Sequence, residues 1–201
     1  MNIGKNKDTD LVDAAADYLS ALDVVYDVAD YVTVNISSPN TAGLRDLQES
    51  AALRALLTTL KRRQGELHAE RGRYVPLAAK VAPDLDDAST DAVAEVLMDV
   101  GIDGCIATNT TISRPVPEGV EHRDETGGLS GAPMHTLAVA RVARLARTLD
   151  GRIPIIGVGG IHDVAGARRF VDAGATLVQL YTGFIYEGPD LVRLVARALG
   201  G

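Results

Sequence analysis

The sequence has little cysteine and no excess of positive charge, and both shortages exclude classes of protein. Cys105 is the only cysteine, so no disulfide can form within the chain, and a reducing compartment fits. Acidic residues outnumber basic ones, 27 to 20, and the formal net charge is -7. The short basic run 61–63 is better interpreted as a solvated helix face than as a phosphate-binding patch. We therefore expect no nucleic-acid partner.

The chain also lacks a long apolar run and the common catalytic signatures. No stretch approaches the roughly 20 apolar residues that span a bilayer, and the polar residues 1–10 do not resemble a signal peptide. There is no GxxxxGK[ST] phosphate loop and no GxSxG elbow. We expect no metal site, because metal-ligand spacing is absent among the histidines, which are His68, His122, His135 and His162.

What the sequence does contain is a repeated alternation of apolar and amphipathic segments. Hydrophobic residues make up 46% of the chain, which is enough for a packed core. Five short runs are apolar almost throughout, as is typical of parallel strands buried on both faces. The predicted strands are 31–35, 75–81, 103–108, 153–157 and 176–181, and residues 2–4 end a further one. The predicted helices are 11–28, 47–67, 89–100, 135–149, 163–173 and 189–199.

Repeated strand–helix units predict an α/β protein with a parallel sheet, but two architectures remain open. One is an open doubly wound sheet of five or six strands. The other is a (β/α)8 barrel, which typically needs about 250 residues, so that two strands would be missing before residue 1. The segment 113–131 is an insertion after the strand 103–108, and it is either a site wall or lid or a plain surface loop.

Polar residues gather at the carboxyl ends of the predicted strands, where parallel α/β folds bind ligands. Lys80 stands in an apolar strand, and an unpaired buried ammonium is costly. A structural ion pair could satisfy it, but an anionic or electron-rich ligand is the preferred interpretation. The glycine-rich turns 157–161 and 181–183 predict a phosphate-bearing ligand if they follow the last two strands of a barrel.

Seven motifs together resemble the dihydroorotate dehydrogenases, and they span nearly the whole chain in the order of that family. The resemblance implies an FMN-dependent (β/α)8 barrel, of which residues 1–201 are the C-terminal part of a single FMN-binding domain with about six of the eight strands. The motifs are NIGKNK (2–7), NISSPN with TAGLR (35–45), KVAPD (80–84), ATNTT (107–111), TGGLSG (126–131), IIGVGGI (155–161) and YTGF (181–184).

The resemblance also implies an activity, the oxidation of (S)-dihydroorotate to orotate in pyrimidine biosynthesis. Ser38 matches the catalytic base and Thr41 the residue that relays its proton. A serine is similar to class 2, which passes electrons to a membrane quinone, whereas class 1 enzymes carry a cysteine there. By the same resemblance the substrate-binding residues are Asn35, Asn40, Asn109 and Thr110. The cofactor-binding residues are Asn2, Asn35, Lys80, Thr108, Gly131, Gly160, Tyr181 and Thr182.

Two parts of the family pattern are absent from this sequence. They are the first two barrel strands and the N-terminal segment through which class 2 enzymes reach the membrane and the quinone. The resemblance implies that the full-length protein associates peripherally with the cytoplasmic face of the cell membrane, whereas this chain alone would be soluble and cytoplasmic. The alternatives are a non-catalytic half-barrel that retains at most FMN or phosphate binding, or a class 1-type enzyme.

Overall fold

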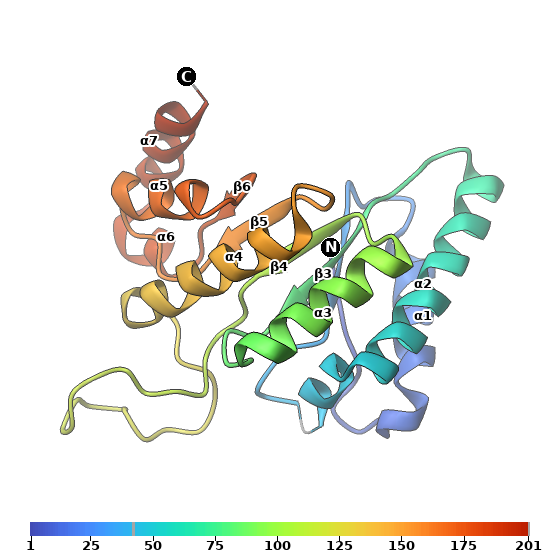
Figure 1. Cartoon of the computed structure of the whole chain (residues 1–201), viewed down its shortest axis with the longest axis horizontal. Helices are drawn as coiled ribbons and strands as arrows, with labels where there is room; N and C mark the ends of the chain where they lie inside the picture. The colour runs from blue at the N-terminus through green and yellow to red at the C-terminus, as the bar shows by residue number, and fades with distance from the viewer. Residues whose placement is uncertain (42, 201) are drawn as a thin grey trace.

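Six parallel strands form a single sheet in the computed structural model, which describes residues 1–41 and 43–200 (Figure 1). Ala42, inside the TAGLR motif, and Gly201, the end of the predicted domain, lie outside the described residues. Each strand pairs with the next one along the chain. The strands are β1 (Asn2–Ile3), β2 (Val32–Asn35), β3 (Leu77–Val81), β4 (Gly104–Ala107), β5 (Ile155–Val158) and β6 (Leu177–Gln179).

The strand order decides between the two predicted architectures. An open doubly wound sheet reverses its order at a switch point, whereas a barrel adds each strand beside the one before, as this sheet does. The sheet also curls. Gln179 Nε2 at the end of β6 donates to Tyr31 Oη just before β2, at 3.1 Å, although four strand spacings on a flat sheet would separate them by about 19 Å. The fold is therefore a partial (β/α)8 barrel.

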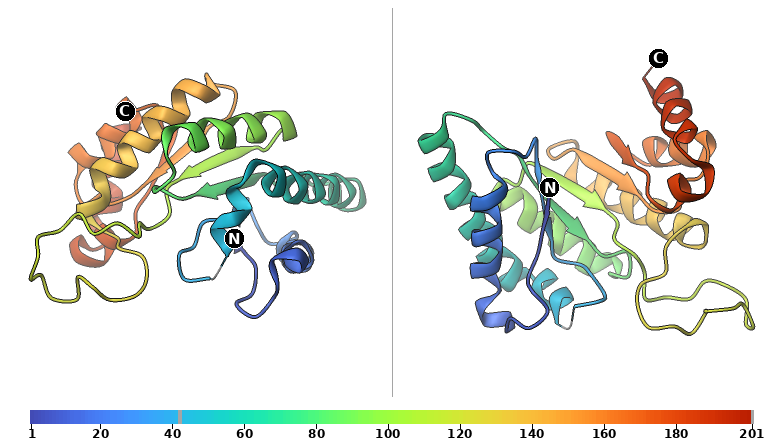
Figure 2. Two further views of the ribbon diagram at one scale, coloured as in Figure 1. Left: turned by 60° about the horizontal axis from the view of Figure 1, so that its bottom comes forward. Right: turned by 180° about the vertical axis from the view of Figure 1, so that it is seen from behind.

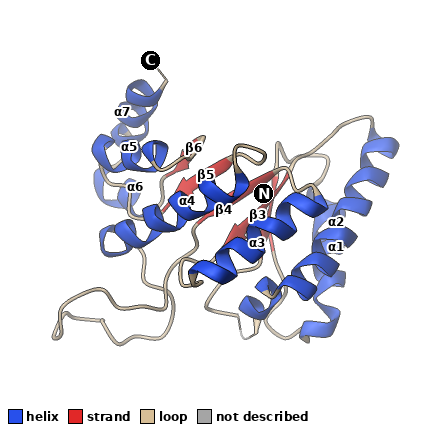
Figure 3. Ribbon diagram, in the orientation of Figure 1, coloured by secondary structure: helices blue, strands red, loops and turns tan. Residues whose placement is uncertain are grey.

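Helices follow the strands in turn and pack against one another around the outside of the sheet (Figures 2 and 3). The predicted helix 135–149 is confirmed without a change of bounds. Asp163 accepts a hydrogen bond from the Gly166 N–H and caps α5. The helices are α1 (Ala14–Val25), α2 (Ser50–Arg71), α3 (Asp87–Val100), α4 (His135–Leu149), α5 (Val164–Asp172), α6 (Thr182–Glu187) and α7 (Asp190–Leu199).

Helix ends differ from the predictions where a capping residue or a 3-10 turn intervenes. The predicted helix 47–67 instead begins at Ser50, because Leu44–Gln48 forms a 3-10 helix, and it runs on to Arg71. It stops there because Gly72 adopts the left-handed conformation with φ 65°. The short helix α6 was not predicted, because six residues are too few for an apolar period to show.

The core lies between the sheet and its helices, and β1 and β6 are the edge strands of the sheet in the described residues. Cys105 is fully buried there, and burial raises the pKa of its thiol to about 12. At the β6 edge Leu177 is 60% exposed, beside an apolar groove that includes Val171 and Val192. Among the described residues, no helix combines the length and the apolar character needed to cross a membrane.

Candidate functional site

Polar groups from five residues meet where β2, β3 and β4 end, and hydrogen bonds hold them together. Asn109 Nδ2 donates to Asn35 Oδ1 and to Ser37 Oγ, at 3.1 Å in each case. Ser37 Oγ donates in turn to the carbonyl oxygen of Lys80 at 2.5 Å. Asn109 Oδ1 accepts from the Thr110 N–H at 2.8 Å. This network, which we call the amide network, fixes the amide of Asn109 in one orientation.

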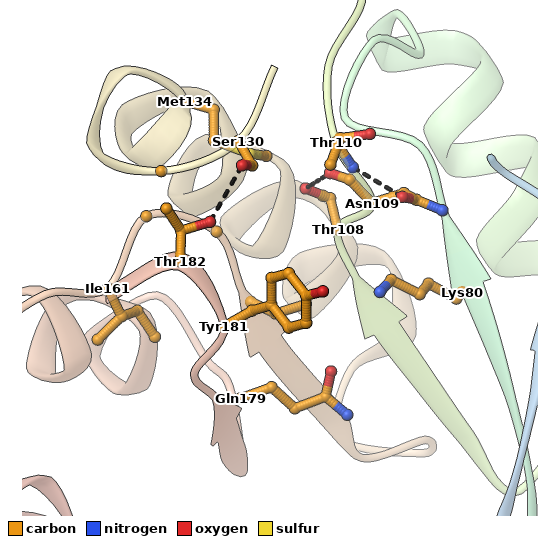
Figure 4. A pocket seen from close by; sticks show the side chains of 14 residues that line it. Lys80, Thr108, Asn109, Thr110, Ser130, Met134, Ile161, Gln179, Tyr181 and Thr182 are labelled. Atoms are coloured by element: carbon orange, nitrogen blue, oxygen red, sulfur yellow. Dashed lines mark hydrogen bonds between the residues drawn. The ribbon is translucent and has the colours of Figure 1, made fainter. Parts of the chain in front are cut away.

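Lys80 on β3 points into the space enclosed by the curled sheet, toward Tyr181 and Gln179 (Figure 4). Within residues 1–41 and 43–200 its ammonium has no ion-pair or hydrogen-bond partner, and burial lowers the pKa of Lys80. The structural ion pair considered for Lys80 is therefore not found in this part of the chain. An anionic or electron-rich group in the cavity would offset the cost of burying the ammonium.

A cavity of about 230 Å³ opens at the carboxyl ends of β3 to β6. Its walls carry both polar groups and apolar side chains, as is common in ligand sites. It brings together most of the residues that the family resemblance assigned to the cofactor (Figure 4). The lining residues are Lys80, Thr108, Asn109, Thr110, Ser130, Gly131, Met134, Val158, Gly159, Gly160, Ile161, Gln179, Tyr181 and Thr182.

Glycines allow three chain segments to meet closely at the β5 and β6 end of the cavity. A Cβ on Gly160 would collide with the carbonyl oxygen of Gly131, and a Cβ on Gly183 would collide with that of Ile161. Beside them Thr182 Oγ1 donates to Ser130 Oγ at 3.0 Å. We call this group the glycine cradle. Its closely packed backbone and paired hydroxyls suit an anion such as a phosphate.

The insertion has its base against the site and its tip in solvent (Figure 1). An antiparallel bridge joins Thr111 to Leu129 and closes the base. A Cβ on the neighbouring Gly128 would collide with Thr110, and it would lie 2.8 Å from Pro39 Cγ. The base of the insertion is therefore a wall beside residues 38–40, whereas its tip is a surface loop.

The predicted site residues do not all lie at the cavity. Nine of them line it or join the amide network directly, but Ser38, Asn40 and Thr41 lie on the loop after β2, outside the cavity lining. On that loop the Asn40 N–H donates to Ser38 Oγ at 3.3 Å. Asn2 is exposed on β1, where it pairs with Thr33. No group of His, Cys, Asp or Glu in the described residues is arranged to hold a metal ion.

Several residues at the site were not predicted from the sequence. Gln179 offered a usable signal, because it is a polar residue inside an apolar strand, just as Lys80 is. Ser37 and Ser130 offered none beyond being small polar residues near strand ends. Arg45 offered no signal, because it stands where a helix start is predicted, and Asp84 offered none, because it stands where a turn is predicted. All five act through contacts between segments far apart in the sequence.

Comparison with known proteins agrees with the fold and the motifs. The dihydroorotate dehydrogenase family matches residues 1–200. The chain is 58% identical over 193 residues to the dihydroorotate dehydrogenase (quinone) of Thiobacillus denitrificans, covering 96% of this chain and 57% of that protein. It is 54% identical over 199 residues to the protein of the same name from Cellvibrio japonicus, covering 99% of this chain and 58% of the relative.

A solved structure gives the same result for the fold. The crystal structure of the dihydroorotate dehydrogenase from Eimeria tenella in complex with ferulenol superposes with a TM-score of 0.92 at 37% sequence identity. The superposition covers 98% of this chain and 56% of that one. The chain thus spans less than two thirds of the length of these relatives. Because the family match covers residues 1–200, this chain belongs to the dihydroorotate dehydrogenase family.

Proposed function

We propose that this chain forms the C-terminal part of a single FMN-binding (β/α)8 domain that oxidises (S)-dihydroorotate to orotate. The observation that carries the proposal is the amide network next to the Ser38 loop. Asn35 and Asn109 are joined by a hydrogen bond of 3.1 Å, and amides supply the donors and acceptors that a cyclic imide with a carboxylate requires. Asn40 and Thr110 extend the same polar surface toward the insertion.

Ser38 is the proposed base, and it takes the proton from C5 of the substrate. A serine hydroxyl is a weak base on its own, so its proton must pass to a neighbour or to water. Thr41 lies three residues along the same loop, where its carbonyl oxygen accepts from the Leu44 N–H at 3.2 Å. In the proposal the Thr41 hydroxyl takes part in that relay. The amide network holds the substrate in place while the proton leaves.

The cavity fits FMN at both of its ends. Lys80 supplies an unpartnered ammonium for an electron-rich ring edge, and Thr108 lines the same cavity. Gly131, Gly160, Tyr181 and Thr182 suit the phosphate-bearing tail, and Asn2 and Asn35 complete the proposed set. FMN, when bound, supplies the two-electron chemistry that dihydroorotate oxidation needs. The Lys80 ammonium stabilises negative charge that develops beside it.

The proposed electron acceptor is a quinone. We propose that the whole protein associates peripherally with the cytoplasmic face of the cell membrane. A serine at position 38, where class 1 enzymes have a cysteine, supports the quinone-linked class. The relatives named dihydroorotate dehydrogenase (quinone) support it too. In the proposal, quinone reaches the flavin through a part of the protein that this chain does not contain.

Anaerobic reduction of the bound flavin tests the proposal. The whole protein should carry a yellow flavin, dihydroorotate should bleach it in one turnover, and a soluble quinone analogue should restore the colour. A protein that holds FMN but keeps its colour with dihydroorotate would favour the non-catalytic half-barrel. A protein that binds no flavin would contradict the cofactor assignment as well.

A further inference from the structure

One guanidinium joins the three loops that follow β2, β3 and β4. Arg45 Nε donates to the carbonyl oxygen of Ser37 at 3.2 Å, on the loop after β2. Its Nη1 pairs with Asp84 Oδ2 at 2.9 Å, after β3. Its Nη2 donates to the carbonyl oxygen of Thr110 at 3.0 Å, after β4. Arg45 therefore contacts the residues that directly precede Ser38 and directly follow Asn109.

Asp84 extends this junction into the base of the insertion. Its Oδ1 accepts hydrogen bonds from the hydroxyls of Thr111 and Ser113, and its Oδ2 accepts from the Ile112 N–H at 3.2 Å. Burial raises the pKa of the Asp84 carboxyl, but the bonds from Thr111 and Ile112 and the charge of Arg45 outweigh it, so the pKa is lowered overall. Asp84 is held as a carboxylate.

The pair is too well enclosed to be an ordinary surface ion pair. The side chain of Arg45 is 21% exposed and that of Asp84 is 13% exposed. Each of the three guanidinium nitrogens donates a hydrogen bond, two of them to backbone carbonyl oxygens and one to the Asp84 carboxylate. A lysine could not reproduce this arrangement, because its ammonium is a single point on a flexible stem.

We propose that Arg45, paired with Asp84, is a positioning residue that sets the Ser38 loop in register with Asn109 and Thr110. This inference rests on the proposed function, in which the alignment of Ser38 with Asn109 and Thr110 serves dihydroorotate oxidation. Arg45 is not among the residues that line the cavity, and its hydrogen bonds go to Ser37, Asp84 and Thr110. It acts by fixing the backbone on either side of the groups that do, and small misplacements of such groups slow a reaction steeply.

The test compares Arg45→Lys with Arg144→Lys in the flavin-loaded whole protein. Arg144 forms a somewhat more exposed pair with Asp91 between α4 and α3, away from the site, with side chains 31% and 29% exposed. Arg45→Lys should keep its flavin and its melting temperature within the range of Arg144→Lys. Its single-turnover reduction by saturating dihydroorotate should slow by about 10- to 100-fold, while Arg144→Lys reduces at the wild-type rate.

A second readout needs no turnover. Amide hydrogen exchange at Ser37 and Thr110 should accelerate together in Arg45→Lys and stay unchanged in Arg144→Lys. Neither N–H group bonds to Arg45 itself, so a change would report movement of the two loops. Unchanged exchange at both amides would overturn the inference, as would a wild-type reduction rate. If dihydroorotate does not bleach even the wild-type flavin, the proposed function fails, and exchange alone still decides whether Arg45 couples the two loops.

Discussion

The two ends of the site are built by different kinds of contact. At the ends of β2 to β4, the amide network and the Arg45 junction join the loops through side-chain hydrogen bonds, such as the one from Asn109 to Asn35. At the ends of β5 and β6, the glycine cradle joins them by direct backbone contact. Side chains can adjust when one contact changes, whereas packed backbone cannot without moving whole loops.

In the proposed function the two ends also have different roles: one carries out the reaction and the other holds the cofactor. We call this the division of work. The β2 to β4 end carries the side chains that can exchange a proton or form hydrogen bonds with a substrate, including Ser38 and Asn109. The glycine cradle presents backbone groups and the paired hydroxyls of Ser130 and Thr182, which hold a ligand without reacting with it. Substitution of Ser38 should therefore change the rate of flavin reduction, and substitutions in the glycine cradle should change flavin binding.

The largest effect on flavin binding is expected from Gly183→Ala at the glycine cradle. The new methyl group would collide with the carbonyl oxygen of Ile161, and backbone on both sides leaves it no room. The variant should lose bound flavin, with at least about a tenfold rise in the dissociation constant, or fail to fold, since overpacking typically costs about 1–3 kcal/mol. Flavin fluorescence titration and the yield of soluble protein measure the two outcomes.

Gly65→Ala is the matched control, because both glycines lie in helices. A Cβ on Gly65 would meet nothing within 4 Å, so alanine there should stabilise α2 by about 0.5–1 kcal/mol and leave flavin binding unchanged. If Gly183→Ala bound flavin as tightly as Gly65→Ala does, the backbone contacts would not be what shapes this end of the site.

The fold could be predicted largely from the sequence because its signals are local. Runs such as 103–108 are buried on both faces and therefore read as strands without a tertiary argument. The choice between barrel and open sheet could not be made from the residues alone, because it depends on strand order and curvature. The bond from Gln179 to Tyr31, across 148 positions, is the kind of contact that decides it.

The site was predictable where a residue breaks a local pattern. Lys80 is a charge in an apolar strand, and Gly160 belongs to a run of glycines after a strand. Arg45 breaks no such pattern, because an arginine near a helix start is ordinary. Its importance comes from acceptors at Ser37, Asp84 and Thr110, which the fold brings together from three loops.

A smaller effect is expected from Asp84→Asn, and its size depends on pH. Because folding lowers the pKa of Asp84, its charged form stabilises the native state above its ordinary value of 3.8, and this contribution is lost as pH falls below that value. The variant should lose about 1–3 kcal/mol of unfolding free energy at pH 7. Urea unfolding at pH 7 and pH 3 should show the difference shrinking at the lower pH. A difference that did not depend on pH would mean that the carboxylate charge is not what Asp84 contributes.

The division of work is tested most directly by measuring flavin content and single-turnover reduction in Ser38→Ala and Thr182→Val. Ser38→Ala should keep its flavin and reduce it about 100- to 10,000-fold more slowly with dihydroorotate. Thr182→Val keeps its shape but loses the hydroxyl bonded to Ser130, so it should bind flavin about fivefold to tenfold more weakly. Its flavin-loaded fraction should react at the wild-type rate. A Ser38→Ala protein that reduces its flavin at the wild-type rate, or variants that lose binding and rate in equal measure, would contradict the account.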